Sequence, residues 1–140
     1  MKKQYVLETV FDPEFNVLAL NSHIKAYKLC WLINKKLCID FAKIDDHVIP
    51  NQGRFVRYSF VNQLTGSFYD ILVNRSKDGF MIKEERGVNF FLKIQTPFWD
   101  QDKKELIKKL KEISEILLIF ELDLKNQNYT DKFIFNDKKN

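Results

Sequence analysis

The side chains best suited by type to do chemistry lie in one short acidic stretch that contains Asp40, Asp45, Asp46 and His47. Carboxylate oxygens and an imidazole nitrogen can bind Mg²⁺, Mn²⁺ or Fe²⁺. However, Asp45 and Asp46 are adjacent, so on a strand they would face opposite sides, and no second histidine lies nearby. We therefore interpret the stretch as a solvated acidic loop and predict no metal site.

The other nucleophilic and basic side chains lack the neighbours that catalysis needs. His23 follows Ser22, which we expect to cap a helix, so His23 is typical of a surface residue. Cys30 and Cys38 have apolar surroundings and no redox or zinc spacing, and we predict that both are buried. The sequence has no Gly-x-Ser-x-Gly elbow, and its four glycines form neither a phosphate loop nor a dinucleotide fingerprint. We predict a protein that is not an enzyme and holds no cofactor.

Length and composition indicate a single globular domain. The chain has 140 residues, of which 45% are hydrophobic and 30% charged, a usual balance for a protein with its own core. No stretch approaches the roughly 18 apolar residues of a membrane span. Glu8, Asp12 and Glu14 interrupt the apolar region that a signal peptide would need. We expect a cytoplasmic protein without a membrane partner.

The charge of the chain bears on its partners. The formal net charge of +4 would favour an acidic partner such as RNA. Lysine supplies most of the positive charge, because the chain has only four arginines. Arginine is the residue that phosphate recognition favours, so the composition weakens the RNA interpretation.

Hydrophobic periodicity predicts a mixture of strands and helices. We expect strands at 5–11, 15–20, 54–62, 67–74, 80–83, 88–94 and 116–124, and helices at 23–36 and from about 100 to 113. Residues 38–53 are interpreted as a loop with a short strand or a turn of helix. The order predicts an α+β fold, with two helices on one face of a mainly antiparallel sheet and a ferredoxin-like βαββαβ core with extra strands. Residues 1–124 would form this domain, and residues 125–140 a polar C-terminal tail.

Two apolar features are not explained by the predicted sheet. The first predicted helix is apolar nearly all round, so we expect one side against the sheet and the other under a loop or a partner. Phe133, Ile134 and Phe135 interrupt the polar tail. They would either dock on the body or act as a short linear binding element. Both features favour a protein that binds another macromolecule.

The stretch from Ile82 to Phe90, which reads Ile-Lys-Glu-Glu-Arg-Gly-Val-Asn-Phe, resembles the motif of a family of small bacterial proteins, the IPExxxVDY family. The similarity covers about residues 20–122 and includes Tyr27–Asn34, Asn74–Ser76 and Phe91–Ile94. This chain has Lys83 where the motif has proline, Asn89 where it has aspartate and Phe90 where it has tyrosine. The resemblance implies no activity, substrate or cofactor.

Two of these replacements bear on whether the motif is chemical or structural. Asn89 lacks the carboxylate, and Phe90 the hydroxyl, that acid–base chemistry would use. A packing role tolerates both changes, since Val88, Phe90 and Leu92 keep an inward parity. Gly87 can supply a positive φ for the turn. We therefore predict that the motif is structural.

The leading functional hypothesis is a non-catalytic module that binds a protein partner. The partner and the oligomeric state stay open, a homodimer included. One alternative is an RNA- or ribosome-associated protein that binds through a basic and aromatic sheet face. The other is a small enzyme or metal binder that uses the Asp40–His47 loop. The candidate binding residues are basic side chains and the tail aromatics: Arg54, Arg57, Arg75, Lys83, Arg86, Phe133 and Phe135.

Overall fold

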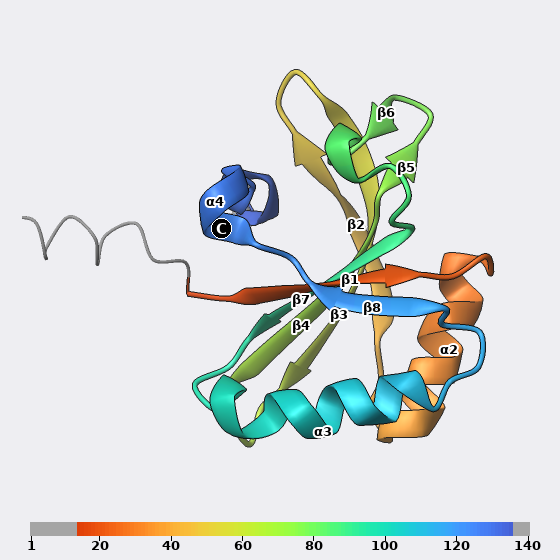
Figure 1. Cartoon of the computed structure of the whole chain (residues 1–140), viewed down its shortest axis with the longest axis vertical. Coiled ribbons are helices and arrows are strands. Elements are labelled where there is room, and N and C mark those ends of the chain that lie inside the picture. Colours follow the sequence, from red (N-terminus) through yellow and green to blue (C-terminus); the bar gives the residue numbers. More distant parts are fainter. Residues whose placement is uncertain (1–13, 136–140) are drawn as a thin grey trace, which may run out of the picture.

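A six-stranded antiparallel sheet organises the chain (Figure 1). The computed structural model describes residues 14–135, apart from the side chains of residues 126 and 127. The strands are β1 (Asn16–Asn21), β2 (Ala42–Ile49), β3 (Gly53–Asn62), β4 (Ser67–Val73), β7 (Phe90–Gln95) and β8 (Leu118–Glu121). Their order is β2-β3-β4-β7-β1-β8, so β2 and β8 are the edges. The predicted strand at 5–11 lies outside the described residues.

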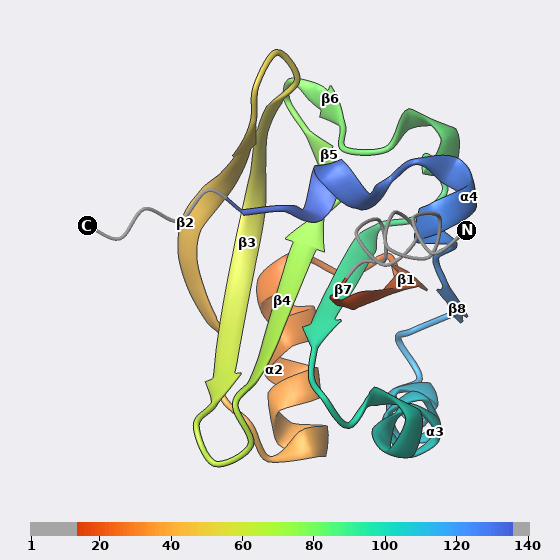
Figure 2. The same ribbon diagram turned by 90° about the vertical axis from the view of Figure 1, so that its left-hand side faces the viewer.

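Two helices cover one face of the sheet. They are α2 (Ala26–Leu37) and α3 (Trp99–Lys111), and Figure 2 shows α2 behind β4. On this side, alternate residues of the strands pack against the inner faces of the two helices. The buried residues of this core include Leu18, Leu20, Leu29, Ile33, Ile71, Phe90, Leu92 and Leu110. A salt bridge of 3.2 Å joins Lys36, at the end of α2, to Glu112, just after α3. No helix within residues 14–135 is long and apolar enough to cross a membrane.

The opposite face is covered by two segments with little regular structure. The β4–β7 connection contains a small hairpin, β5 (Arg75–Ser76) and β6 (Gly79–Phe80), and the 3₁₀ turn η1 (Lys83–Glu85). The C-terminal segment contains α4 (Leu124–Gln127) and η2 (Thr130–Phe133), and crosses in front of β3 and β4 in Figure 2. Both segments bury apolar side chains against Phe55, Leu72 and Phe91 of the sheet. The sheet therefore has a core on each face.

The β4–β7 connection is held against the sheet by Asn74, a polar residue with no exposed surface. Its side-chain nitrogen donates to the carbonyl oxygens of Glu85 and Val88, each at 2.9 Å. Its side-chain oxygen accepts a hydrogen bond of 3.0 Å from the backbone N–H of Ile82. One carboxamide thus forms hydrogen bonds with three backbone groups of an irregular segment. Without these bonds the three groups would be buried unpaired, which would destabilise the fold.

The motif-like stretch 82–90 belongs to this connection and is tied to the end of β1. The side-chain oxygen of Asn89 accepts the backbone N–H of Ser22 at 2.8 Å. Asn21 donates from its side chain to the carbonyl oxygen of Gly87, also at 2.8 Å. The φ angle of Gly87 is not positive, so the predicted left-handed turn is wrong there. A 3₁₀ turn at 83–85 reverses the chain instead.

The predicted parity of the strand that follows is correct only in part. Phe90 and Leu92 pack in the helix-side core, whereas Val88 packs in the core on the opposite face. The strand begins at Phe90, so Val88 precedes it and is free of its alternation. Phe91 is also fully buried, because the sheet is covered on both faces.

The α+β class and the mainly antiparallel sheet are confirmed, but the ferredoxin-like arrangement is not. The sheet has six strands, with β2 and β3 added beyond β4, and short helical segments follow β8. Residues 42–49 form an edge strand where the sequence predicted mainly a loop. Many side chains of an edge strand are exposed to water and can be charged. The sequence of such a strand therefore lacks the regular alternation of apolar and polar residues that predicts strands.

The two cysteines have opposite environments, so the prediction that both are buried is wrong for Cys38. Cys30 is 2% exposed, and its burial raises its pKa to about 12. Cys38 is exposed and forms the C-cap of α2 in the left-handed conformation, with φ of 57°. Helices commonly end with a residue in this left-handed conformation, and here that residue lies at the surface.

We expect one fast-reacting thiol in the native protein when it is titrated with a disulfide reagent. Cys38→Ser should remove the fast phase and Cys30→Ser should leave it. Because burial raises the pKa of Cys30 to about 12, its thiol stays protonated, and going from about pH 7 to about pH 9 should not accelerate its reaction. Denaturant should release the second thiol. Two fast thiols in the folded protein would contradict the burial of Cys30.

Asn74→Ala should destabilise the fold strongly. The change leaves two buried carbonyls and one buried N–H without their side-chain partner, at about 1–3 kcal/mol for each group that finds no water. Urea denaturation measures the free energy of unfolding. Gln63→Ala, in the exposed β3–β4 turn, should change it by no more than about 0.5 kcal/mol. Similar small effects for both variants would show that Asn74 does not hold the connection.

Candidate functional site

The acidic stretch does not form a site. Asp40 and Asp45 are exposed, whereas His47 is only 4% exposed. Ile44 pairs with Arg57 and His47 with Phe55, so two residues of β2 face one of β3 in a β-bulge. Among residues 14–135, no group of His, Cys, Asp or Glu side chains could hold a metal ion.

His47 serves packing on the face that the C-terminal segment covers. Its Nε2 lies 2.8 Å from the carbonyl oxygen of Lys132, so this nitrogen donates the hydrogen bond. The ring of Phe135 meets the imidazole edge-on, with 4.8 Å between ring centroids. His47 therefore anchors the C-terminal segment to the edge strand.

A buried cluster of charges lies beneath the same segment. Arg57 Nε donates to Asp70 Oδ1 at 2.9 Å, and the two side chains are 8% and 5% exposed. The ring of Phe135 covers the guanidinium at 3.6 Å and the ammonium of Lys93 at 4.0 Å. Phe15 contacts the same ammonium at 4.5 Å. These cation–π contacts shield the charges from water.

The candidate binding residues therefore fall into several environments. Arg57 is inside the protein, so it cannot belong to an exposed basic face. Phe133 is fully buried in the core, which confirms that the tail aromatics dock on the body. Arg54, Arg75 and Arg86 are exposed. Lys83 is exposed as well and lines a cleft.

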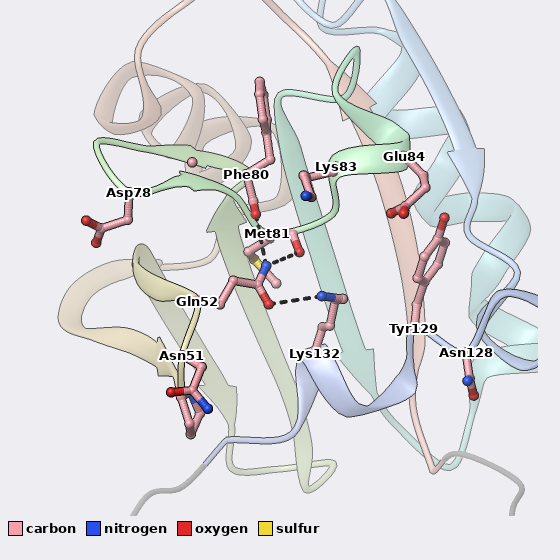
Figure 3. A pocket seen from close by; sticks show the side chains of 12 residues that line it. Asn51, Gln52, Asp78, Phe80, Met81, Lys83, Glu84, Asn128, Tyr129 and Lys132 are labelled. Atoms are coloured by element: carbon pink, nitrogen blue, oxygen red, sulfur yellow. Dashed lines mark hydrogen bonds between the residues drawn. The ribbon is translucent and has the colours of Figure 1, made fainter.

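This cleft, which we call the motif cleft, lies on the covered face of the sheet and has a volume of about 730 Å³ (Figure 3). Its walls are the β2–β3 turn, the β5–β6 hairpin, η1 and the C-terminal segment. Its lining includes the polar side chains of Gln52, Lys83, Glu84, Tyr129 and Lys132. The motif-like stretch thus supplies one wall.

Gln52 joins three of these walls. Its side-chain nitrogen donates to the carbonyl oxygens of Phe80 and Met81, and its oxygen accepts from Lys132 Nζ at 3.0 Å. Gly53 permits the close approach of the β2–β3 turn to the hairpin, since a Cβ there would lie 2.6 Å from Asp78 Cβ. Hydrogen bonds therefore hold the walls of the cleft in position relative to one another.

Several polar side chains in the cleft could still form hydrogen bonds or ion pairs with a ligand. Lys83 and Glu84 form no hydrogen bond or ion pair within the described part of the chain. Tyr129 is 5% exposed and its hydroxyl also has no bonding partner there. Burial raises the pKa of Tyr129, and the negative charges of Glu85 and Glu84 raise it further. The phenol is thus a neutral donor at physiological pH.

A second candidate surface is the outer face of α2. Tyr27 and Trp31, one turn apart, are 65% and 54% exposed, and the ammonium of Lys35 lies 4.6 Å from the centre of the Trp31 ring. The helix sequence contains no aspartate or glutamate. Only one side of α2 is buried, through Leu29, Cys30 and Ile33, so the outer stripe of the apolar helix faces water.

Sequence reasoning missed the motif cleft. Gln52 lies far from Tyr129 and Lys132 in the chain, in a segment interpreted as a turn, whereas the other two belong to the segment interpreted as a tail. The one local signal is Asn51 with φ of 65°, since asparagine adopts the left-handed conformation of tight turns more readily than most residues. That signal predicts a turn but not what the turn contacts.

Comparison with protein-family models gives no match to the chain, and no curated protein matches it. The resemblance of residues 82–90 to the IPExxxVDY motif therefore stays a prediction.

Asp70→Asn should destabilise the protein by about 3–5 kcal/mol, because it removes the carboxylate charge that lies 2.9 Å from the buried Arg57 guanidinium. Urea denaturation measures this loss. The matched control is Glu121→Gln, which breaks the pair of Glu121 with Lys103, whose side chains are 34% and 44% exposed. Exposed pairs contribute less than about 1 kcal/mol. Equal losses for the two variants would mean that burial does not strengthen the Arg57–Asp70 pair.

Proposed function

We propose that the chain is a non-catalytic module that binds a protein partner through the outer face of α2. The observation that carries the proposal is the pair Tyr27 and Trp31, exposed one turn apart on a packed helix. Tyrosine and tryptophan dominate the binding energy of protein interfaces, because each buries a large area with few rotatable bonds.

The charge around these aromatics supports one kind of partner. Lys25, Lys28 and Lys35 are exposed on or beside the helix, which carries no acidic residue. A partner surface that is apolar at its centre and acidic at its rim would complement this face. The proposed partner is therefore a protein with an acidic, apolar segment.

The alternatives have less support. An RNA-binding sheet needs an open face with basic side chains, whereas both faces of β7 are covered and Arg57 is buried. An enzyme or metal site at Asp40–His47 needs converging side chains, whereas His47 is buried under the C-terminal segment and Asp40 is in water.

Two finer proposals accompany this one. The adjacent strands β4, β7, β1 and β8, with α2 and α3 on one face, support a ferredoxin-like plan extended by β2 and β3. Two free cysteines support a cytoplasmic location.

The test places a photo-crosslinking amino acid at Trp31 and, as a control, at Leu64, which is 97% exposed in the β3–β4 turn. We expect a nuclease-resistant, stoichiometric adduct with an acidic protein from position 31 only. Trp31→Ala should weaken binding of the isolated partner at least about 30-fold, since a hot-spot residue contributes about 2 kcal/mol or more. Leu64→Ala should leave binding unchanged.

Other results would overturn the proposal. A nuclease-sensitive adduct would favour RNA. An adduct between two copies of the chain would replace the acidic partner with self-association. Equal adducts from positions 31 and 64, or none, would show that α2 is not the binding face.

A further inference from the structure

The motif cleft contains positively and negatively charged side chains that do not form ion pairs with one another. Lys83 and Glu84 are neighbours in η1, yet adjacent residues do not face one another well enough to pair. Neither forms an ion pair with another described residue. In Figure 3 the Lys83 ammonium lies over the cleft, and the Glu84 carboxylate lies at the side where Tyr129 stands.

Lys132 supplies a second cation from the opposite wall. Its Nζ donates one hydrogen bond, to Gln52 Oε1 at 3.0 Å. An ammonium has three donors, so two remain, and no other described residue accepts them. Gln52 is fixed by its own bonds to the backbone of Phe80 and Met81. The ammonium is therefore held in place with donors left over.

Tyr129 adds a buried side chain whose polar end reaches the cleft. The residue is 5% exposed and its hydroxyl has no hydrogen-bond partner among the described residues. Figure 3 shows the hydroxyl pointing to the Glu84 side of the cleft. The hydroxyl itself is not a buried unpaired atom, so it is open to the cleft and free to bond a ligand there.

We propose that the motif cleft binds a small zwitterion, with its carboxylate between Lys83 and Lys132 and its protonated amine against Glu84 and the Tyr129 hydroxyl oxygen. A volume of about 730 Å³ suits a ligand the size of a short peptide. A plain anion would leave Glu84 unpaired and repelled, and a plain cation would do the same to the two lysines. This site is separate from the α2 face and would stand if the protein-binding proposal failed.

The test uses three matched peptides: triglycine, its N-acetyl form, which lacks the amine charge, and triglycinamide, which lacks the carboxylate. Amide chemical shifts of Gly79, Lys83 and Lys132 are followed by NMR up to about 10 mM peptide, a range that reports millimolar dissociation constants. We expect triglycine to bind and each capped peptide to bind on the order of tenfold more weakly, because each lacks one charge-assisted hydrogen bond.

Variants assign each charge. Lys132→Gln and Lys83→Gln should weaken triglycine about tenfold and leave triglycinamide unchanged, while Glu84→Gln should weaken triglycine and leave the N-acetyl peptide unchanged. Tyr129→Phe keeps the ring and should weaken triglycine severalfold. Lys77→Gln, an exposed charge outside the cleft, is the control. The dispersion of each variant's spectrum reports its fold.

Three outcomes would overturn the proposal. In the first, none of the three peptides shifts the resonances of the cleft, which would mean that the cleft does not bind zwitterions. The N-acetyl peptide could bind as tightly as triglycine with no effect of Glu84→Gln, which would mean a site for anions. Lys77→Gln could weaken triglycine as much as Lys83→Gln, which would reduce the effect to surface charge.

Discussion

The carboxamide of Asn74 is the interaction on which the second face of the sheet depends. The β4–β7 connection crosses this face without regular hydrogen bonding for most of its length, so its backbone groups need partners from elsewhere. Asn74 supplies three, and all lie in residues 82–88. With the connection fixed, Met81 and Ile82 are fully buried, and η1 becomes one wall of the motif cleft.

The C-terminal segment completes this face by a different kind of interaction. Phe133 packs edge-on against Phe91 at 5.3 Å, and Phe135 lies over the charges of Arg57 and Lys93. Burying charges in the middle of a sheet is costly unless they are paired. Here the carboxylate of Asp70 and an aromatic ring share that role, which makes the segment part of the core.

The helix-side half of the fold could be predicted from the sequence. Residues such as Leu18, Leu20, Phe90 and Leu92 alternate with a period of two, and α2 and α3 repeat their apolar residues at helical spacing, so local patterns suffice. The opposite face could not be predicted, because the segments that cover it have little regular secondary structure. The side-chain hydrogen-bond partners of Asn74 and Gln52 lie 8 to 80 residues away, and no periodicity reports such contacts.

The same limit applies to the candidate sites. The apolar first helix predicted a second side covered by a loop or a partner, whereas Tyr27 and Trp31 on that side are exposed and no described loop covers them. Arg57 and His47 were expected at the surface by residue type, but the cross-strand pairing and the returning C-terminal segment bury them. Charge in a sequence indicates solubility and partners only when the residue is not used for packing.

The position of the covering segment in the chain also constrains how the protein is made. Synthesis delivers residues in order, and Phe133 comes more than 30 residues after the last residue of β7. Until it arrives, the ring of Phe91 and the charges beside it have no cover. A nascent chain that already contains the whole sheet would thus still present an apolar surface to chaperones. Folding would be complete only when the C-terminal segment packs on that surface.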